Sequence, residues 1–188
     1  MPATAISAPV AERETGATAP TGATGTGPLA DLVREIEAAL ARSAGARGVA
    51  DGLAPFLGDP DLLTPADCLP AEGCYARNLL HAAEDGSFSI WAMVWQPGQG
   101  SSIHDHSCWC VMGVHRGVLV EEGFVADGDA ARPARQTRCG TGTVRALEPG
   151  ADDIHRIANA GTATAISIHV YGFDPAVVAS SVGRTYTA

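Results

Sequence analysis

The pattern of apolar residues divides the chain into a helical part and a strand-rich part. Within 29–44 apolar residues recur at spacings of three to four, which predicts an amphipathic helix. These residues are Leu29, Leu32, Ile36 and Leu40. Residues 47–57 predict a second short helix, which Gly58 and Pro60 end.

From about residue 74 the apolar residues fall into short runs rich in β-branched and aromatic side chains, separated by Gly, Pro, Asp or Asn. The runs are FSIWAMVW (88–95), CWCVMGV (108–114), GVLVEEGFV (117–125), GTVRAL (142–147) and TATAISIHVYGF (162–173). Such runs predict strands, and no helical pattern lies between them. We therefore expect a mostly β fold, an antiparallel sandwich or barrel, with short N-terminal helices.

The domain organisation follows from length and composition. Residues 1–28 are Ala, Thr, Gly and Pro with few large apolar side chains, so we expect a disordered tail. The remaining 29–188 are long enough for one domain with a real core and leave little for a second. We expect helices over 29–60 and a β-barrel over about 73–175.

Composition narrows the possible partners. All 12 basic residues are arginine, against 21 acidic ones, and the net charge is −9. The arginines form no basic stripe, so neither nucleic acid nor an anionic membrane is an expected partner. No run approaches the roughly 18 apolar residues that span a bilayer, and we expect no secretory signal. Five cysteines without a disulfide framework fit a reducing, cytoplasmic setting.

The segment SSIHDHSCWC (101–110) carries the first candidate chemistry. Residues two apart on a strand share a face, so His104 and His106 point the same way. Facing inward they form a chelate for a transition metal, and facing outward they are two solvent-exposed histidines. Cys108 and Cys110 cannot complete a zinc site with them, because four alternate residues spread over about 20 Å of strand.

Two segments resemble the motifs of the cupins. Residues 98–117 read G-x5-H-x-H-x3-C-x6-G, with Cys110 where cupins usually carry a glutamate ligand. Downstream, PGADDIHRIAN (149–159) resembles the second motif, although its Pro–Gly spacing departs from the general pattern. Because both occur in the cupin order, the resemblance implies a double-stranded β-helix, or jelly-roll barrel. It also implies a metal site built from His104, His106 and His155.

Closer resemblance is to the type I cysteine dioxygenases, a family of thiol dioxygenases, and it extends over about 73–175. It is carried by YARNLL (75–80), PGQGSSIHDH (97–106), IHRIAN (154–159) and SIHVYGFDP (167–175). The resemblance implies iron(II), Fe(II), on the three histidines, and it alone favours iron over nickel or zinc. Three neutral ligands would keep the full metal charge and favour a thiolate. The substrate L-cysteine would bind through sulfur and amine, and O2 would convert its sulfur to a sulfinic acid without an external reductant.

The resemblance also implies a substrate-binding pair and a hydrogen-bonded relay. Arg77 matches the arginine that binds the substrate carboxylate, for which a planar guanidinium is suited, and Tyr75 matches the tyrosine beside it. Their residue types alone favour a structural salt bridge for Arg77 and a core position for Tyr75. Ser167, His169 and Tyr171 match a Ser-His-Tyr relay that orients a phenol beside the metal. The alternative is a strand whose polar face looks to solvent.

Some members of the family join a cysteine to the relay tyrosine by a thioether. Counting back from Gly117 places Cys110 at the matching position, so Cys110 and Tyr171 are the expected crosslink pair. Cys108 shares the parity of Cys110 and stays an alternative inward thiol. The alternative for Cys110 is a buried, unmodified cysteine that fills space in the core.

Two other functions compete with cysteine dioxygenation. Related bacterial enzymes oxidise 3-mercaptopropionate, generally lack the arginine matching Arg77 and carry a later one. Two residues support 3-mercaptopropionate as the alternative substrate, namely Trp109 and Arg184, which lies thirteen residues after Tyr171. A metal-stabilised cupin that only binds a small ligand is the second alternative. We expect a monomer, and we expect His81 and His115 at the surface or in turns.

Overall fold

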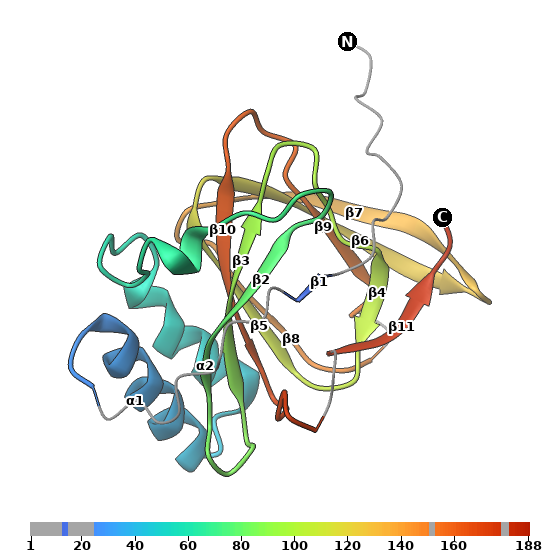
Figure 1. Ribbon diagram of the computed structural model, residues 1–188. Coiled ribbons are helices and arrows are strands. Elements are labelled where there is room, and N and C mark those ends of the chain that lie inside the picture. The colour runs from blue at the N-terminus through green and yellow to red at the C-terminus, as the bar shows by residue number, and fades with distance from the viewer. Residues whose placement is uncertain (1–12, 15–24, 151–152, 178–180) are drawn as a thin grey trace.

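Two facing β-sheets with helices on one side make up the described part of this computed structural model, residues 13–14, 25–150, 153–177 and 181–188 (Figure 1). The six-stranded sheet has the order β1-β2-β3-β10-β5-β8 and the five-stranded sheet the order β11-β4-β9-β6-β7. The strands are β1 (Arg13–Glu14), β2 (Ala76–Ala82), β3 (Ser89–Trp95), β4 (Ile103–His106), β5 (Cys110–Arg116), β6 (Val118–Asp127), β7 (Ala130–Gly140), β8 (Val144–Leu147), β9 (His155–Ala158), β10 (Ala165–Tyr171) and β11 (Val182–Tyr186). The strands β2 to β11 pair antiparallel, whereas β1 runs parallel to β2.

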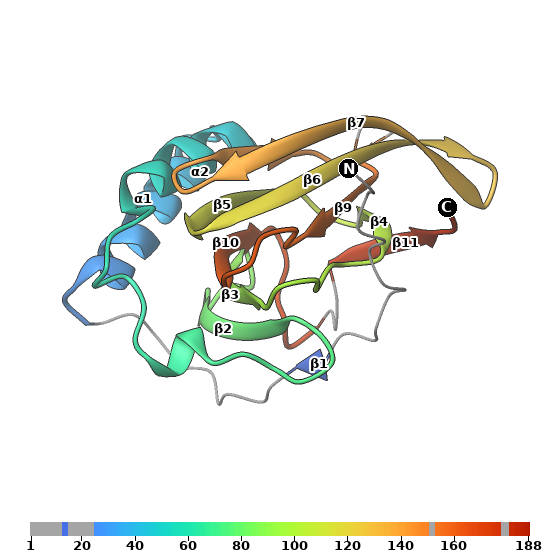
Figure 2. The same cartoon turned by 90° about the horizontal axis from the view of Figure 1, so that it is seen from above.

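The helices cover the outer face of the six-stranded sheet. They are α1 (Pro28–Ala41), α2 (Gly45–Leu53) and two short 3-10 helices, Ala54–Phe56 and Ala66–Cys68. Figure 2 shows α1 and α2 on the same side of the barrel. The apolar face of α1, with Leu32 and Ile36, packs in one cluster with Ile168 of β10. Among the described residues no helix is long and apolar enough to cross a membrane.

Because helices cover one face and the second sheet the other, β3 and β10 are buried on both faces. Along β10, Ile166, Ile168 and Val170 join the cluster that includes the helices. The alternate residues Ser167, His169 and Tyr171 therefore point toward the barrel interior. Burial of both faces explains how a strand with three polar or aromatic inward residues still lies in the core.

The predicted elements are largely confirmed, including both helices and the five apolar strands. The structure adds strands outside these five runs, namely β2, β4, β7, β9 and β11. Of these, β7 and β11 are mostly exposed, so they lack the apolar alternation that marks a half-buried strand. Of the predicted tail, 1–12 and 15–24 lie outside the described residues, and Arg13–Glu14 form β1.

The expectation for His81 and His115 was wrong. His81 lies on β2 and His115 lies on β5, and they are only 5% and 8% exposed. His81 packs against the ring of Phe88 with centroids 5.4 Å apart. His115 Nδ1 accepts a hydrogen bond from the backbone N–H of Gly58 at 3.4 Å. The helical layer and its connections cover these strands, and a histidine pattern read along one strand does not reveal that cover.

Candidate metal centre

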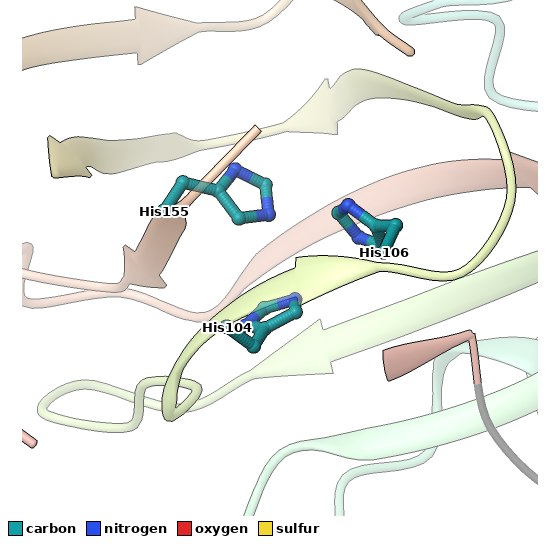
Figure 3. Close-up of side chains that lie close together, drawn as sticks. All are labelled: His104, His106 and His155. Atoms are coloured by element: carbon teal, nitrogen blue, oxygen red, sulfur yellow. The ribbon is translucent and has the colours of Figure 1, made fainter. Parts of the chain in front are cut away.

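Three buried histidines meet inside the barrel (Figure 3). His104 and His106 lie on the same face of β4, and His155 begins β9. The two strands pair antiparallel with His104 directly opposite His155, which brings the third imidazole to the first two. One ligand atom from each ring lies within 4.8 Å of the others. The structure thus brings together the three residues that the sequence predicted.

Each imidazole is oriented through its Nδ1 atom. His104 Nδ1 donates to the carbonyl oxygen of Ser102 at 3.0 Å, and His106 Nδ1 donates to Asp153 Oδ1 at 2.9 Å. His155 Nδ1 donates to Glu121 Oε1 at 3.3 Å. Carbonyl and carboxylate oxygens only accept, so Nδ1 carries the hydrogen in each neutral ring. The Nε2 lone pairs remain available for a metal, and this is the tautomer that a ligating histidine needs.

The electrostatics also fit a metal centre. Burial, reinforced by the neighbouring His155 and His106, holds the pKa of His104 well below its ordinary value. Burial also lowers the pKa of His155, although its hydrogen bond to Glu121 acts in the opposite direction. Both rings are therefore neutral near pH 7, the form that binds metal. Three imidazole ligands suit a divalent first-row transition metal.

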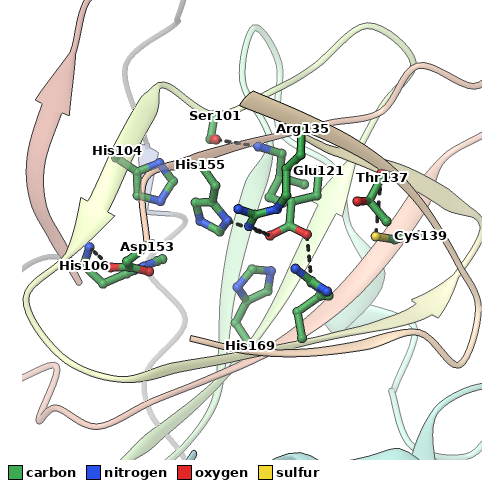
Figure 4. Close-up of polar contacts among 12 residues, drawn as sticks. Ser101, His104, His106, Glu121, Arg135, Thr137, Cys139, Asp153, His155 and His169 are labelled. Atoms are coloured by element: carbon green, nitrogen blue, oxygen red, sulfur yellow. Dashed lines mark hydrogen bonds and ion pairs between the residues drawn. The ribbon is translucent and has the colours of Figure 1, made fainter. Parts of the chain in front are cut away.

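Two buried carboxylates behind the histidines were missed from the sequence. Asp153 accepts both the ring Nδ1–H of His106 and its backbone N–H, the latter at 2.6 Å. Glu121 contacts His155 on one side and is paired with two arginines on the other, Arg145 at 2.8 Å and Arg135 at 3.6 Å (Figure 4). Such outer carboxylates raise the basicity of the histidine ligands. They therefore moderate the charge that three neutral ligands alone would leave on a metal.

Glu121 stays ionised despite its position. Burial acts to raise its pKa, but the hydrogen bond with His155 and the charges of Arg145 and Arg135 lower the pKa below its ordinary value. The sequence carried one signal for this role. Glu121 follows the buried Leu119 at a spacing of two on β6, so it points to the interior while Glu122 does not.

Removing the charge of Asp153 is expected to weaken metal binding. In Asp153→Asn one of the two His106 N–H groups would face an amide NH2 group instead of a carboxylate oxygen. We expect metal affinity to fall roughly 10- to 100-fold, as for other outer partners of ligating histidines. Titration of the metal-loaded protein with a competing chelator measures this, with the exposed Asp129→Asn as control. Unchanged affinity in a folded variant would contradict the assignment.

The histidines open onto a pocket that also contains the predicted substrate-binding pair. Tyr75 and Arg77 line it together with His104, His106 and His155. Arg77 is 3% exposed, and its guanidinium carbon lies 4.9 Å from the centroid of the Trp91 ring. The ring of Tyr75 stacks on Trp95 with centroids 4.1 Å apart. Arg77 is thus buried beside the histidines and does not lie at the surface.

The predicted relay residues form a hydrogen-bonded chain. Ser167 Oγ lies 2.9 Å from His169 Nε2, and the Tyr171 hydroxyl lies 3.1 Å from His169 Nδ1. The structure adds Trp95, whose indole N–H donates to Ser167 Oγ at 2.9 Å. Burial holds the pKa of His169 well below and that of Tyr171 well above their ordinary values. The chain is therefore a neutral imidazole and a protonated phenol, and His169 and Tyr171 both line the pocket.

Of the two candidate cysteines, Cys110 is the one brought to Tyr171. They are directly opposite each other on the paired strands β5 and β10. Burial raises the pKa of the Cys110 thiol well above its ordinary value. Cys108 is only partly buried, and burial raises the pKa of its thiol to about 11.

Arg184 and Trp109 do not line the pocket. These are the two residues that supported 3-mercaptopropionate as the alternative substrate. The guanidinium of Arg184 pairs with the exposed Asp129 and lies over the ring of Tyr186. The indole of Trp109 lies against the backbone of Gly172 and packs with the helix-covered core. The structure therefore places the Arg184 guanidinium outside the pocket.

A barrel of two β-sheets around three inward-facing imidazoles defines a cupin with a candidate metal site. The model of the family "Cysteine dioxygenase type I" matches residues 29–177. The chain belongs to this family, and membership implies an oxidoreductase of the thiol dioxygenase class.

Similar solved structures include two bacterial proteins. One is an uncharacterized conserved protein with a double-stranded β-helix domain from Klebsiella pneumoniae, with 17% identity over 62% of this chain and 87% of that chain and a TM-score of 0.48. The other is a Cupin 2 conserved barrel domain protein from Salinispora arenicola, with 21% identity over 62% of this chain and 89% of that chain and a TM-score of 0.42.

Proposed function

We propose that the protein is an iron(II)-dependent cysteine dioxygenase, which adds both atoms of O2 to the sulfur of L-cysteine. The product is cysteine sulfinic acid, and the sulfur supplies all the electrons that reduce O2. The observation that carries this proposal is a buried arginine, Arg77, in the pocket that contains the three histidines. The arginine would bind a carboxylate and a metal on the histidines would bind a thiolate, so the expected ligand is a small thiol that carries a carboxylate.

His104, His106 and His155 would hold the iron through their Nε2 atoms. When bound, iron(II) would supply Lewis acidity toward the thiolate sulfur and one-electron chemistry with O2. Arg77 would bind the substrate carboxylate through its planar fork, and the Trp91 ring beneath it restricts the guanidinium orientation. Both contacts would fix the sulfur relative to the histidines, so the protein contributes orientation before any bond changes.

Tyr171 would act as a proton-holding group beside the reacting sulfur. Its phenol lines the pocket and is held by His169, which in turn is held by Ser167. Because the phenol keeps its proton, it would donate a hydrogen bond to an oxygen or sulfur atom that gains negative charge. Tyr75, stacked on Trp95, would form the wall of the pocket beside Arg77.

Oxygen uptake with two substrates tests this proposal against its alternatives. We expect a larger kcat/KM for L-cysteine than for 3-mercaptopropionate, because Arg77 lines the pocket and Arg184 lies outside it. Sulfinate should form in step with O2 consumption. A much larger kcat/KM for 3-mercaptopropionate would overturn the substrate, and bound iron without sulfinate would support a cupin that only binds a ligand.

We also propose that Cys110 and Tyr171 form a thioether after turnover. Their opposition on β5 and β10 supports this pair over Cys108. The S–H bond of Cys110 and one ring C–H bond of Tyr171 break as the C–S bond forms, and O2 accepts the two hydrogen atoms to give hydrogen peroxide. Tryptic mass spectrometry after turnover should show one joined peptide pair in the wild type and none in Cys110→Ala. Recovery of only free Cys110 peptide from a turned-over sample would exclude the crosslink.

A further inference from the structure

The last strand lies beyond the part of the chain that matches the family, yet it borders the metal-binding strand. The match ends at residue 177, and β11 begins at Val182. β11 pairs antiparallel with β4, and Val182 and Thr185 are opposite His106 and His104 (Figure 1). A strand outside the family match therefore supports the two histidines of β4.

Asp105 attaches β11 to β4 between the two histidines. Its Oδ1 accepts a hydrogen bond from the backbone N–H of Arg184 at 2.6 Å, and its Oδ2 accepts one from the Tyr186 hydroxyl at 2.7 Å. The Asp105 side chain thus points away from the pocket while His104 and His106 point into it. These contacts fix β11 against β4 independently of the ladder hydrogen bonds.

Ser181, directly before β11, reaches the pocket itself. Ser181 and Val182 both line it, and Ser181 is 3% exposed. The carbonyl oxygen of Ser181 accepts hydrogen bonds from Ser107, at 2.9 Å from the backbone N–H and 3.3 Å from Oγ. Ser107 directly follows His106 in the chain, so the backbone of Ser181 is fixed relative to the metal-binding strand.

Ser181 lines the same pocket as the Tyr171 phenol. Burial raises the pKa of that phenol, and the nearby Ser181 side chain acts against this effect. Tyr171 therefore has two neighbours of fixed position, His169 from its own strand and Ser181 from the C-terminal segment. A phenol with fixed neighbours on two sides has less freedom to turn away from the pocket.

We propose that Ser181 is a positioning residue for Tyr171 and that Ser181 with β11 forms one wall of the substrate pocket. The part of this inference that concerns turnover rests on the proposed dioxygenase function. Ser181 acts through Tyr171, so its removal should affect kcat more than KM. The proposed contact between Arg77 and the substrate carboxylate would not involve Ser181, so KM should not change.

A double-mutant cycle tests the proposal. Ser181→Ala is expected to lower kcat about 3- to 10-fold, the effect of losing one hydrogen bond. KM and iron content should be unchanged, and Ser181→Thr should restore most of the rate. In a Tyr171→Phe background Ser181→Ala should have no further effect. Thr185→Ala removes an exposed hydroxyl from the same strand and is the control. An equal loss in both backgrounds would overturn the proposal.

A second measurement does not depend on the enzyme being active. The chain has three tyrosines, so NMR of metal-free protein labelled at tyrosine Cζ gives few signals, assigned through Tyr→Phe variants. We expect Ser181→Ala to move the Tyr171 Cζ resonance and to leave that of Tyr75 in place. An unmoved Tyr171 resonance would refute the contact. Absence of sulfinate from the wild type would refute the proposed function instead, without bearing on this result.

Discussion

His104→Ala is expected to abolish both iron binding and thiol oxidation. The variant removes one of three Nε2 ligands, and the remaining pair, His106 and His155, cannot replace it because their rings are held by Asp153 and Glu121. The loss of metal affinity should exceed the roughly 100-fold that loss of an outer partner costs. Metal analysis after anaerobic reconstitution with iron(II), followed by oxygen uptake with L-cysteine, measures both effects.

The matched control for His104→Ala is another buried histidine outside the pocket. His115→Gln keeps an acceptor for the Gly58 N–H and should retain iron and activity. Circular dichroism of each variant shows whether the fold persists. A folded His104→Ala protein that keeps full iron content would disprove the three-histidine centre.

Arg77→Leu is expected to raise KM for L-cysteine far more than it lowers kcat. Truncating one partner of a buried, hydrogen-bonded charge pair costs about 2–5 kcal/mol. At 1.4 kcal/mol per factor of ten, this corresponds to roughly 30- to 4000-fold in kcat/KM. Arg77→Lys should recover part of the loss, because it keeps the charge and loses the planar fork. Steady-state oxygen uptake across substrate concentration separates KM from kcat.

Two controls make the Arg77 result specific. Cysteamine has the thiol and amine of L-cysteine but no carboxylate, so its oxidation should be nearly equal in the wild type and Arg77→Leu. Arg184→Leu should leave KM for L-cysteine unchanged, since Arg184 pairs with Asp129 outside the pocket. An increase in KM with Arg184→Leu and none with Arg77→Leu would reverse the assignment of the carboxylate-binding residue.

Much of the site could be predicted because it depends on parity along single strands. His104 and His106 on β4, and Ser167, His169 and Tyr171 on β10, each share a face by the two-residue period of a strand. Parity within one strand does not indicate a ligand from another strand. The resemblance to a known family predicted that His155 joins His104 and His106. The structure confirmed that these histidines cluster, and the roles of the other residues stay predictions.

The outer contacts could not be predicted in this way, because they join residues far apart in the sequence. Asp153 is 47 residues from His106, Glu121 is 34 from His155 and Trp95 is 72 from Ser167. No local period encodes such pairs, which form only when the strands are placed side by side. The same reason explains the wrong expectation for His81, whose burial depends on side chains from neighbouring elements.

The sequence by itself determined the mostly β class, the N-terminal helices and the residue types at the metal centre, since periodicity and motif order are local properties. Only the tertiary structure decided which acids hold the histidines, which cysteine is opposite Tyr171 and which arginine lines the pocket. It also brought Ser181 and β11 to the site. Burial and hydrogen-bond geometry arise from strand pairing between distant segments, and that pairing settles these choices.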